Sequence, residues 1–541
     1  MVDTIPFETA LARLQSAAVL PMRDGGLATE QLLAAFHPDH GPDAKAILRV
    51  GANRGAACHP ALARLLESRS LIDDVDLAAT LPLRTDVLVI GGGGAGAAAA
   101  LAAAAAGAEV VVANKLRIGD SNTVMAEGGI QAAVGEDDSL QRHFDDTVKG
   151  GHFVADRDLV AQLVGDGPEI IRWLITLGVS FDLAEGGPVG GRLMRKRAGG
   201  TTVPRVLSHR DFTGLEIMRT LRETVELDRN IMVMNRFPAV ELLSDERGNC
   251  AGAVLYDLEH RRFRVVRAGA VILATGGAGR LHLAGFATSN HYGATADGLA
   301  LAYRIGATLR DLDSFQYHPT GIAYPSLFAG GLVSEAARSA GAQLVNGLGE
   351  RFIDELAPRD VVTAAILREC AQGRGIERQG AKGVFLDIPG LLRQKPDILE
   401  KQLVSLAHLA HRCHIDPKME PLLIYPTLHY QNGGVVIDKS SETEVPGLYA
   451  AGEVAGGIHG RNRLMGNALL DILVFGRRAG AAAAARAKGR EQSRAGLAHV
   501  HQFQRELTEA GLSDVQASPL LYPPYGNFEL RRHMAGDGKG R

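Results

Sequence analysis

Three glycines near residue 90 have the spacing of a phosphate-binding turn. In the stretch DVLVIGGGGAGAAAALAAAAAGAEVVVAN, the glycines Gly91, Gly93 and Gly96 fit the pattern G-x-G-x-x-G. A strand-like run precedes them, an alanine-rich helical run follows, and a second strand-like run comes next, which is the context that this pattern requires. The first glycine makes the tight turn, the second lets the backbone approach a pyrophosphate, and the third allows close helix–sheet packing. The sequence therefore predicts a dinucleotide site with the phosphates at a helix N-terminus.

The strand ends around this motif indicate which dinucleotide it holds. The second strand ends in Asn114-Lys115, where an acidic residue commonly binds a ribose, so we expect an amide or the backbone to make that hydrogen bond. In VILATGGAGR, Thr275 and the glycine pair that starts at Gly276 follow a second strand-like run. The segment GLYAAGE places Glu453 at a further strand end. Several strand ends closing around one extended ligand favour FAD over NAD.

Charge and cysteine content exclude several other classes of protein. The 541 residues include 58 basic and 61 acidic ones, a balance without the basic footprint of a nucleic-acid-binding protein. The cysteines Cys58, Cys250, Cys370 and Cys413 are scattered and form no C-x-x-C pair. Neither a disulfide framework nor a metal or iron–sulfur ligand set is indicated, and we expect a reducing, cytoplasmic environment.

One uncharged stretch has the length of a membrane span. It runs from Val87 to Ala108, but four consecutive glycines interrupt it and alanine makes up most of the rest. Since glycine clusters break structure rather than extend it, we interpret the stretch as strand, turn and helix. The N-terminus carries acidic residues early and does not have the pattern of a signal peptide. We therefore expect a soluble protein.

Apolar patterning divides the chain into five segments. Residues 1–84 read as a helical extension, and residues 85–311 alternate strand-like and helical runs, which is typical of an α/β layer structure. Residues 312–428 are more mixed, residues 429–486 return to the strand-and-glycine style, and residues 487–541 read as a short, loose C-terminal tail. We expect an α/β domain that is interrupted by an insert and resumes after it.

Nine segments in a fixed order resemble one family of flavoproteins. They are SNTVMAEGG, RDFTG, FQYHPTG, VSEAARSAGAQLVN, GERF, APRDVV, HYQNGG, GLYAAGE and HGRNRLMGNALLD, and they cover about residues 85 to 485. The set resembles the flavoprotein subunits of succinate dehydrogenase and fumarate reductase, a family that includes L-aspartate oxidase. The resemblance implies a Rossmann-like FAD-binding domain interrupted by an α+β capping domain.

The resemblance also assigns roles to individual residues. It implies that His318, Ser334, Glu335, His429 and Arg463 bind the dicarboxylate substrate, and that Arg359 is the proton donor, with Glu335 and Arg338 as its relay. A guanidinium rarely releases a proton, so this role requires that the proton be replaced at once. The residues implied to bind FAD are Gly91, Gly93, Gly94, Ala95, Gly96, Asn114, Lys115, Asn122, Thr123, Gly128, Gly129, Thr275, Gly276, Asp297, Glu453, Asn467, Ala468 and Leu469.

Two positions depart from the family pattern. The respiratory members carry a histidine that bonds covalently to the flavin, and this chain has Asn122 there. An amide side chain has no nucleophilic nitrogen, so we expect non-covalent FAD, which is typical of fumarate reductases and L-aspartate oxidases. The second departure is SAG at 339–341, where many members have G-E-G, and it assigns no substrate.

These features predict an enzyme that reduces fumarate, or a related unsaturated C4 dicarboxylate, by hydride transfer from flavin N5. The electrons would come from an iron–sulfur subunit or another carrier, which could also attach the protein to a membrane. The first alternative is L-aspartate oxidase, although HPTG and NRLMGNALLD are closer to the reductase pattern. The second is a flavin electron-transfer subunit whose substrate pocket is idle.

Overall fold

The unit predicted from the glycine motif lies within the eight-stranded sheet, the larger of the two main sheets of the described residues. Strand β5 (Leu83–Ile90) enters the turn, helix α4 (Gly94–Ala105) follows, and β6 (Val110–Asn114) returns parallel to β5. The uncharged stretch is therefore strand, turn and helix, as predicted. The computed structural model describes residues 4–17, 19–23, 25–41, 43–72, 82–184, 192–489, 494–512 and 516–521. Among these residues, none of the helices combines the length and apolarity needed to cross a membrane.

The larger sheet combines a parallel half with an antiparallel half. Its strand order is β21-β10-β11-β12-β5-β6-β9, with β20 paired to β12. The parallel half consists of β9 (Ile231–Asn235), β6, β5, β12 (Arg262–Leu273) and β20 (Leu448–Ala450). The antiparallel half adds β10 (Ala239–Asp245), β11 (Cys250–Asp257) and β21 (Ala495–Gly496).

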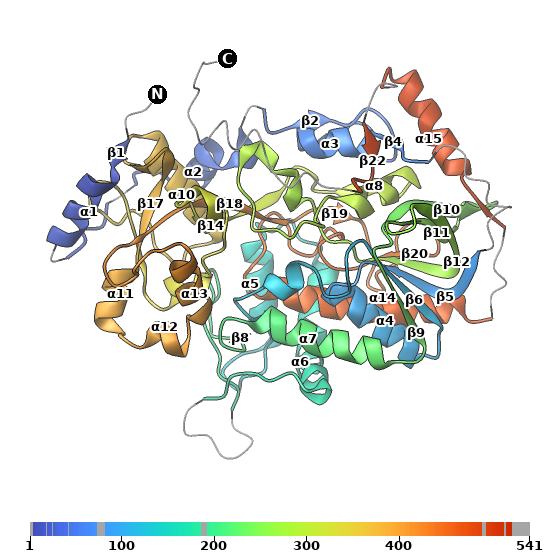
Figure 1. Ribbon diagram of the computed structural model, residues 1–541, viewed down its shortest axis with the longest axis horizontal. Helices are drawn as coiled ribbons and strands as arrows, with labels where there is room; N and C mark the ends of the chain where they lie inside the picture. The colour runs from blue at the N-terminus through green and yellow to red at the C-terminus, as the bar shows by residue number, and fades with distance from the viewer. Residues whose placement is uncertain are drawn as a thin grey trace.

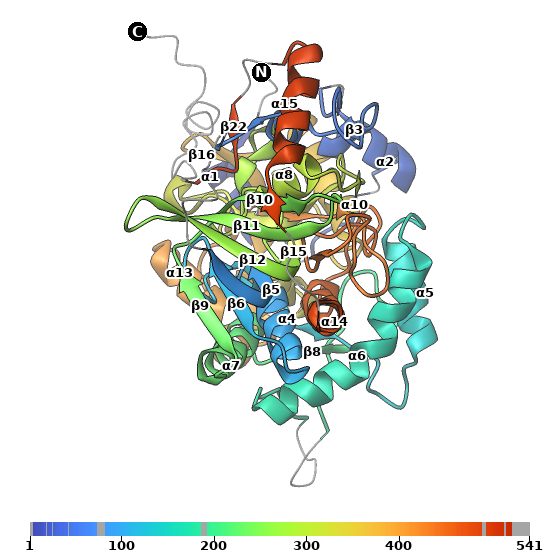
Figure 2. The same ribbon diagram turned by 90° about the vertical axis from the view of Figure 1, so that its right-hand side faces the viewer.

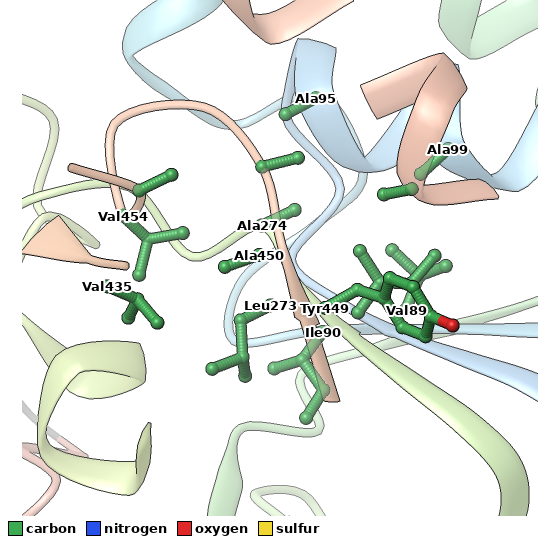
Figure 3. Packing of buried hydrophobic residues seen from close by; sticks show 14 of the residues in the cluster. Val89, Ile90, Ala95, Ala99, Leu273, Ala274, Val435, Tyr449, Ala450 and Val454 are labelled. Carbon is green, nitrogen blue, oxygen red and sulfur yellow. The ribbon is translucent and has the colours of Figure 1, made fainter. Parts of the chain in front are cut away.

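Helices cover the parallel half of this sheet on one side (Figure 2). They are α4, α7 (Thr213–Leu227), α14 (Asn467–Ala487) and, beyond α14, α6 (Arg157–Leu177) and α5 (Leu140–Gly150). Helix α14 packs closely on α4 because glycines of α14 face the backbone of α4. A Cβ on Gly480 would lie 2.1 Å from the carbonyl oxygen of Ala99. Figure 3 shows the core here, with Val89, Ile90 and Leu273 on the strands and Ala95 and Ala99 on α4.

The second lobe, at the left of Figure 1, is built on a smaller sheet with the strand order β1-β16-β17-β18-β14 and with β15 paired to β17. Its strands are β1 (Ile5–Pro6), β14 (Phe315–Ile322), β15 (Gln343–Val345), β16 (Ile376–Arg378), β17 (Ala381–Asp387) and β18 (Leu422–Gln431). Its helices are α9 (Glu335–Ser339), α10 (Arg359–Ala371), α11 (Ile388–Gln394), α12 (Ile398–Lys401) and α13 (Val404–Arg412). We call it the cap lobe. The predicted boundary at 428/429 falls inside β18, and the domain division stays a prediction.

Short elements complete the described chain. They are β7 (Ile130–Gln131) paired with β8 (Val206–Leu207), β13 (Leu309–Arg310) paired with β19 (Gly434–Val435), and the 3-10 turns η1 (Pro38–His40), η2 (Asn122–Met125), η3 (Gly279–Leu281), η4 (Leu283–Gly285) and η5 (Ser326–Phe328).

The N-terminal segment connects the two lobes. Helices α1 (Phe7–Ser16) and α2 (Thr29–Phe36) pack on the cap lobe, where the ring of Phe7 meets Phe385 edge-on at 5.2 Å. The chain then forms β2 (Ala46–Ile47), β3 (Ala57–Cys58), α3 (Pro60–Leu66) and β4 (Arg69–Ser70). Helix α3 packs on α8 (Asp297–Arg304), which belongs to the lobe built on the larger sheet. The predicted helical extension therefore also contains short strands.

The loose tail predicted after residue 487 was wrong for residues 494–512 and 516–521. Helix α15 (Ala498–Glu509) buries Val500, Phe503 and Leu507, whose spacing places them on one helix face. Strand β22 (Ala517–Ser518) pairs with β4. The prediction followed the polar composition of this segment and overlooked these three apolar residues on one face of the helix.

Candidate active site

A cavity of about 810 Å³ runs from the glycine turn to the cap lobe, and most of the predicted site residues line it. From the cofactor set these are Gly91, Gly93, Gly94, Ala95, Asn114, Lys115, Asn122, Thr123, Gly128, Gly129, Thr275, Gly276, Asp297, Glu453, Ala468 and Leu469. From the substrate and catalytic set they are His318, Ser334, Glu335, Arg359, His429 and Arg463. The predicted residues Gly96, Arg338 and Asn467 do not line the cavity.

The glycine turn lines the cavity, and close packing requires two of its glycines. Gly91 has a φ of +105°, and a Cβ there would lie 2.3 Å from the carbonyl oxygen of Ala274. A Cβ on Gly96 would lie 1.8 Å from the carbonyl oxygen of Gly91, so this glycine serves helix–strand packing and not the cavity wall. Helix α4 begins at Gly94 with its N-terminus at the cavity, where N–H groups without a partner inside the helix and the helix dipole favour an anion.

Two polar atoms at the strand ends lack partners within the described chain. Oδ1 of Asn114 and Oγ1 of Thr275 are buried, and neither has a hydrogen-bond partner there. Buried polar atoms in native proteins are normally satisfied, so both fit a ligand that carries hydroxyl groups. Together with the glycine turn, these atoms fit a dinucleotide such as FAD.

Asn122 is fixed by three neighbours. Its Nδ2 donates to Oδ1 of Asn290 at 2.6 Å and to Oε2 of Glu453 at 3.3 Å, and its Oδ1 accepts from the backbone N–H of His291 at 2.7 Å. Thr123 accepts from the backbone N–H of Gly94 at 3.1 Å through its hydroxyl oxygen. The loop is therefore held against the glycine turn, against Asn290-His291 and against Glu453.

Glu453 lines the cavity, whereas the side chain of Asn467 does not. Burial raises the pKa of Glu453 to about 7, although the backbone N–H of Gln431 donates to its Oε1 at 2.9 Å. The side chain of Asn467 is committed elsewhere, because Oδ1 lies 2.9 Å from Nε2 of His143 and Nδ2 donates to Thr147 at 3.0 Å. Any contribution of Asn467 to the cavity comes from the start of α14, where Ala468 and Leu469 line the wall.

Two guanidinium groups meet on the cap-lobe side of the cavity. Arg359 Nη1 and Arg463 Nη2 both donate to Oε1 of Gln316, at 3.2 and 2.9 Å. The amide of Gln316 is fixed in turn, since its Nε2 donates to Asn462 Oδ1 at 2.8 Å. Arg463 also lies over the ring of Tyr430, 4.5 Å from its centroid. Burial, followed by the charge of Arg359, lowers the pKa of Arg463 to about 10.

Glu335 is the carboxylate that connects this cluster to Arg338. Its Oε2 accepts from Arg359 Nε at 2.8 Å and from Arg338 Nη2 at 3.2 Å, and its Oε1 accepts from the backbone N–H of Gly199 at 2.8 Å. Burial alone would raise the pKa of this carboxyl, but Arg359 and Arg338 outweigh it and hold the pKa at about 2. Arg338 is fully buried beside Glu335.

Two neutral histidines face each other beside the arginines. The rings of His318 and His429 are 5.2 Å apart, and burial followed by Arg359 lowers the pKa of both far below the usual value. The backbone N–H of Thr320 points at Nδ1 of His318 at 3.3 Å, which leaves Nε2 as the donor of the neutral ring. His429 lies at a β-bulge, because Gln316 pairs with Tyr430 and Tyr317 with Leu428, and bulges commonly re-aim side chains at active sites.

Some site residues were missed at the level of sequence. Gln316 lies two positions before His318, a spacing that places both on one face of a strand and could have revealed it. Asn290, Ser289 and Tyr430 gave no comparable signal: Ser289 Oγ lies 2.7 Å from Nδ1 of His429, and such a contact depends on the fold. Within the described ranges, no group of three or more His, Cys, Asp or Glu side chains has a metal-binding arrangement.

The fold and this cavity define an FAD-dependent oxidoreductase. The family described as "FAD binding domain" matches residues 86–469, and the chain belongs to this family. One subunit of the fumarate reductase (CoM/CoB) from Methanothermobacter marburgensis is 39% identical over 84% of this chain and 81% of its own length. An L-aspartate oxidase from Streptomyces coelicolor is 38% identical over 85% of this chain and 77% of its own length. The solved FrdA of Escherichia coli quinol fumarate reductase is 32% identical, with a TM-score of 0.71 over 80% of this chain and 75% of its own.

Proposed function

We propose that this protein reduces fumarate, or a closely related unsaturated C4 dicarboxylate, to the saturated acid. The observation that carries the proposal is the buried charge around Glu335. Arg338 and Arg359 both donate to this carboxylate, Arg463 shares Gln316 Oε1 with Arg359, and the side chains of Glu335 and the three arginines are buried. Since uncompensated buried charge is costly, the cluster favours an anionic ligand.

The cavity wall offers donors of the kinds that two carboxylates require. Arg463 can form a paired, charge-assisted contact with one carboxylate. His318 and His429, kept neutral by burial and by Arg359, can each donate a single hydrogen bond. Ser334 lines the same wall, and its hydroxyl oxygen also accepts from the backbone N–H of Ala336 at 3.3 Å. These residues would hold and orient the substrate.

Arg359 is proposed as the proton donor, with Glu335 and Arg338 replacing the proton it loses. Bound FAD would supply the hydride at the neighbouring carbon. A guanidinium is a weak acid, so the transfer needs prompt reprotonation. Glu335 can carry a proton between the two arginines, because one of its oxygens contacts both of them at 2.8 and 3.2 Å.

The main alternative is oxidation of L-aspartate, which the relative from Streptomyces coelicolor supports. L-Aspartate carries an ammonium group, and the cluster of Glu335 with the three arginines has an excess of positive charge. Glu335 is already engaged by two arginines and by Gly199, so it is a poor partner for another cation. Electrostatics therefore favour the reductase. A flavin carrier with an idle pocket would not require this arrangement of donors.

Electrons for the reduction would come from an iron–sulfur subunit or another reduced carrier, which could also bring the protein to a membrane. The test uses the purified protein with its flavin reduced under anaerobic conditions. Fumarate should reoxidise the flavin, and L-aspartate should leave oxidised flavin unchanged. Reduction of the flavin by L-aspartate would instead establish the oxidase, and no response to either compound would favour the idle pocket.

A further inference from the structure

Lys115 is held by three acceptors at one end of the cavity. Its Nζ donates to Thr295 Oγ1 and to Asp297 Oδ2, each at 2.9 Å, and to the backbone carbonyl oxygen of Leu520. An ammonium group has three protons, and these contacts use all of them. Thr295 also donates to Oδ1 of Asp297 at 2.7 Å, so the carboxylate is fixed on both oxygens.

Leu520 belongs to the C-terminal segment 516–521, which we call the strap. Strand β22 of the strap pairs in parallel with β4 of the N-terminal segment. Ser518, which has no exposed surface, contacts Ser68 through their hydroxyl groups at 2.6 Å. The strap is therefore seated by backbone pairing and by a buried polar contact.

Arg304 fastens the strap to helix α8, the helix that begins at Asp297. Its Nη1 donates to Ser518 Oγ and its Nη2 to the carbonyl oxygen of Ser518, both at 3.1 Å. Its Nε donates to Glu241 at 2.7 Å, and both of these side chains are buried. The two ends of α8 thus connect to the strap, through Asp297 and Lys115 at one end and through Arg304 at the other.

The position of Lys115 relates the strap to one half of the cofactor. In a Rossmann-like unit the first turn takes the pyrophosphate, and the end of the second strand takes the ribose of the adenosine half. Lys115 directly follows β6, the second strand of this unit. The strap and the segment on which it is seated lie outside residues 86–469, which the family matches.

We propose that the strap retains FAD by positioning Lys115 and Asp297 at the adenosine end of the cofactor site. The strap contacts Lys115 through Leu520 and does not line the cavity, so its residues are positioning residues. Since the flavin is expected to be non-covalent, contacts at the adenosine end would determine how fast FAD leaves. The inference depends on FAD binding and is independent of which substrate the enzyme reduces.

The test measures FAD release from the holoenzyme after dilution, by the rise in flavin fluorescence. Ser518→Leu places a larger side chain at a fully buried position and should accelerate release at least tenfold. Ser16→Leu makes the same change at an exposed position and should leave the release rate unchanged. The absorption spectrum of the flavin still bound should match the wild type, because the strap acts at the other end of the cofactor.

A pair of shortened chains gives a second measurement. A chain ending at Leu512 lacks the strap and should also release FAD at least tenfold faster, whereas a chain ending at Leu521 should behave as the full chain. Wild-type release rates in both Ser518→Leu and the chain ending at Leu512 would overturn the proposal. A changed spectrum of the bound flavin in these variants would also overturn it, since the disturbance would then reach the isoalloxazine end.

Discussion

Arg359 and Arg463 are held side by side because both donate to one oxygen, Oε1 of Gln316, at 3.2 and 2.9 Å. A neutral amide thus brings two positive groups together without neutralising either. The pair belongs to two distant parts of the chain, the start of α10 and the loop before α14. Gln316 therefore sets both the spacing and the net charge of the proposed anion site.

Gln316→Glu should weaken dicarboxylate binding. A carboxylate at this position would pair with both arginines and compete with the substrate. We expect the dissociation constant for succinate to rise at least tenfold, or about 1.4 kcal/mol, in a titration of the flavin spectrum. Gln372→Glu makes the same charge change at an exposed residue and should have no effect. Unchanged affinity in Gln316→Glu would contradict the assigned anion site.

Glu335→Gln should separate binding from proton delivery. The amide cannot carry a proton between Arg359 and Arg338, so the rate of fumarate reduction should fall by roughly 10²- to 10⁴-fold. Succinate should still bind at least as tightly, because a negative charge has been removed from the site. Rapid-reaction kinetics and a binding titration measure the two effects. A normal rate would exclude Glu335 from the relay, and Glu350→Gln at a half-buried site is the matched control.

The flavin should leave the protein on denaturation. By the resemblance, Asn122 takes the place of the histidine of the covalent members, and its amide is engaged by Asn290, Glu453 and His291. Acid precipitation should therefore transfer all yellow colour to the supernatant. Quantifying FAD there against protein in the pellet checks the prediction, and colour that remains in washed pellet would show a covalent bond.

Asp39→Asn should protect the protein at high pH. Asp39 accepts from the backbone N–H of Phe315 at 2.8 Å, just before Gln316, and burial raises the pKa of Asp39 to about 8. A carboxyl whose pKa is raised by folding costs stability as the pH climbs from the unfolded value of about 4 through 8. The wild type should thus lose about 2–3 kcal/mol relative to Asp39→Asn between pH 6 and pH 9.

Urea unfolding at pH 6 and pH 9 measures this difference. Asp397→Asn, at a residue that is 66% exposed, serves as the control and should show no pH-dependent gain. A gap between wild type and Asp39→Asn that is the same at both pH values would show that Asp39 is ionised in the folded protein at pH 6.

The parts of the site that lie within one short stretch of chain could be predicted from the sequence. The turn at Gly91, Gly93 and Gly96 and the helix that follows could be recognised from neighbouring residues, and both were confirmed. The loop at Asn122 and the strand carrying His318 were found through contiguous motifs. Such stretches carry their own turn chemistry and periodicity.

The contacts between distant segments could not be predicted in this way. Nothing near Gln316 indicates that its amide meets Arg359 and Arg463, 43 and 147 positions away. Likewise, Leu520 offers Lys115 a backbone carbonyl, which no side-chain pattern records. The stripe of Val500, Phe503 and Leu507 was hidden because three apolar residues in a polar segment are a weak signal.

We propose that Arg359 supplies the proton in fumarate reduction. The most direct measurement mixes anaerobically reduced protein with fumarate and follows flavin reoxidation, for the wild type and for Arg359→Gln, with succinate binding measured in parallel. We predict rapid reoxidation of the wild type and a loss of at least 10³-fold in Arg359→Gln, which should still bind succinate. Reoxidation of Arg359→Gln at the wild-type rate, or no reoxidation of the wild type, would contradict the account.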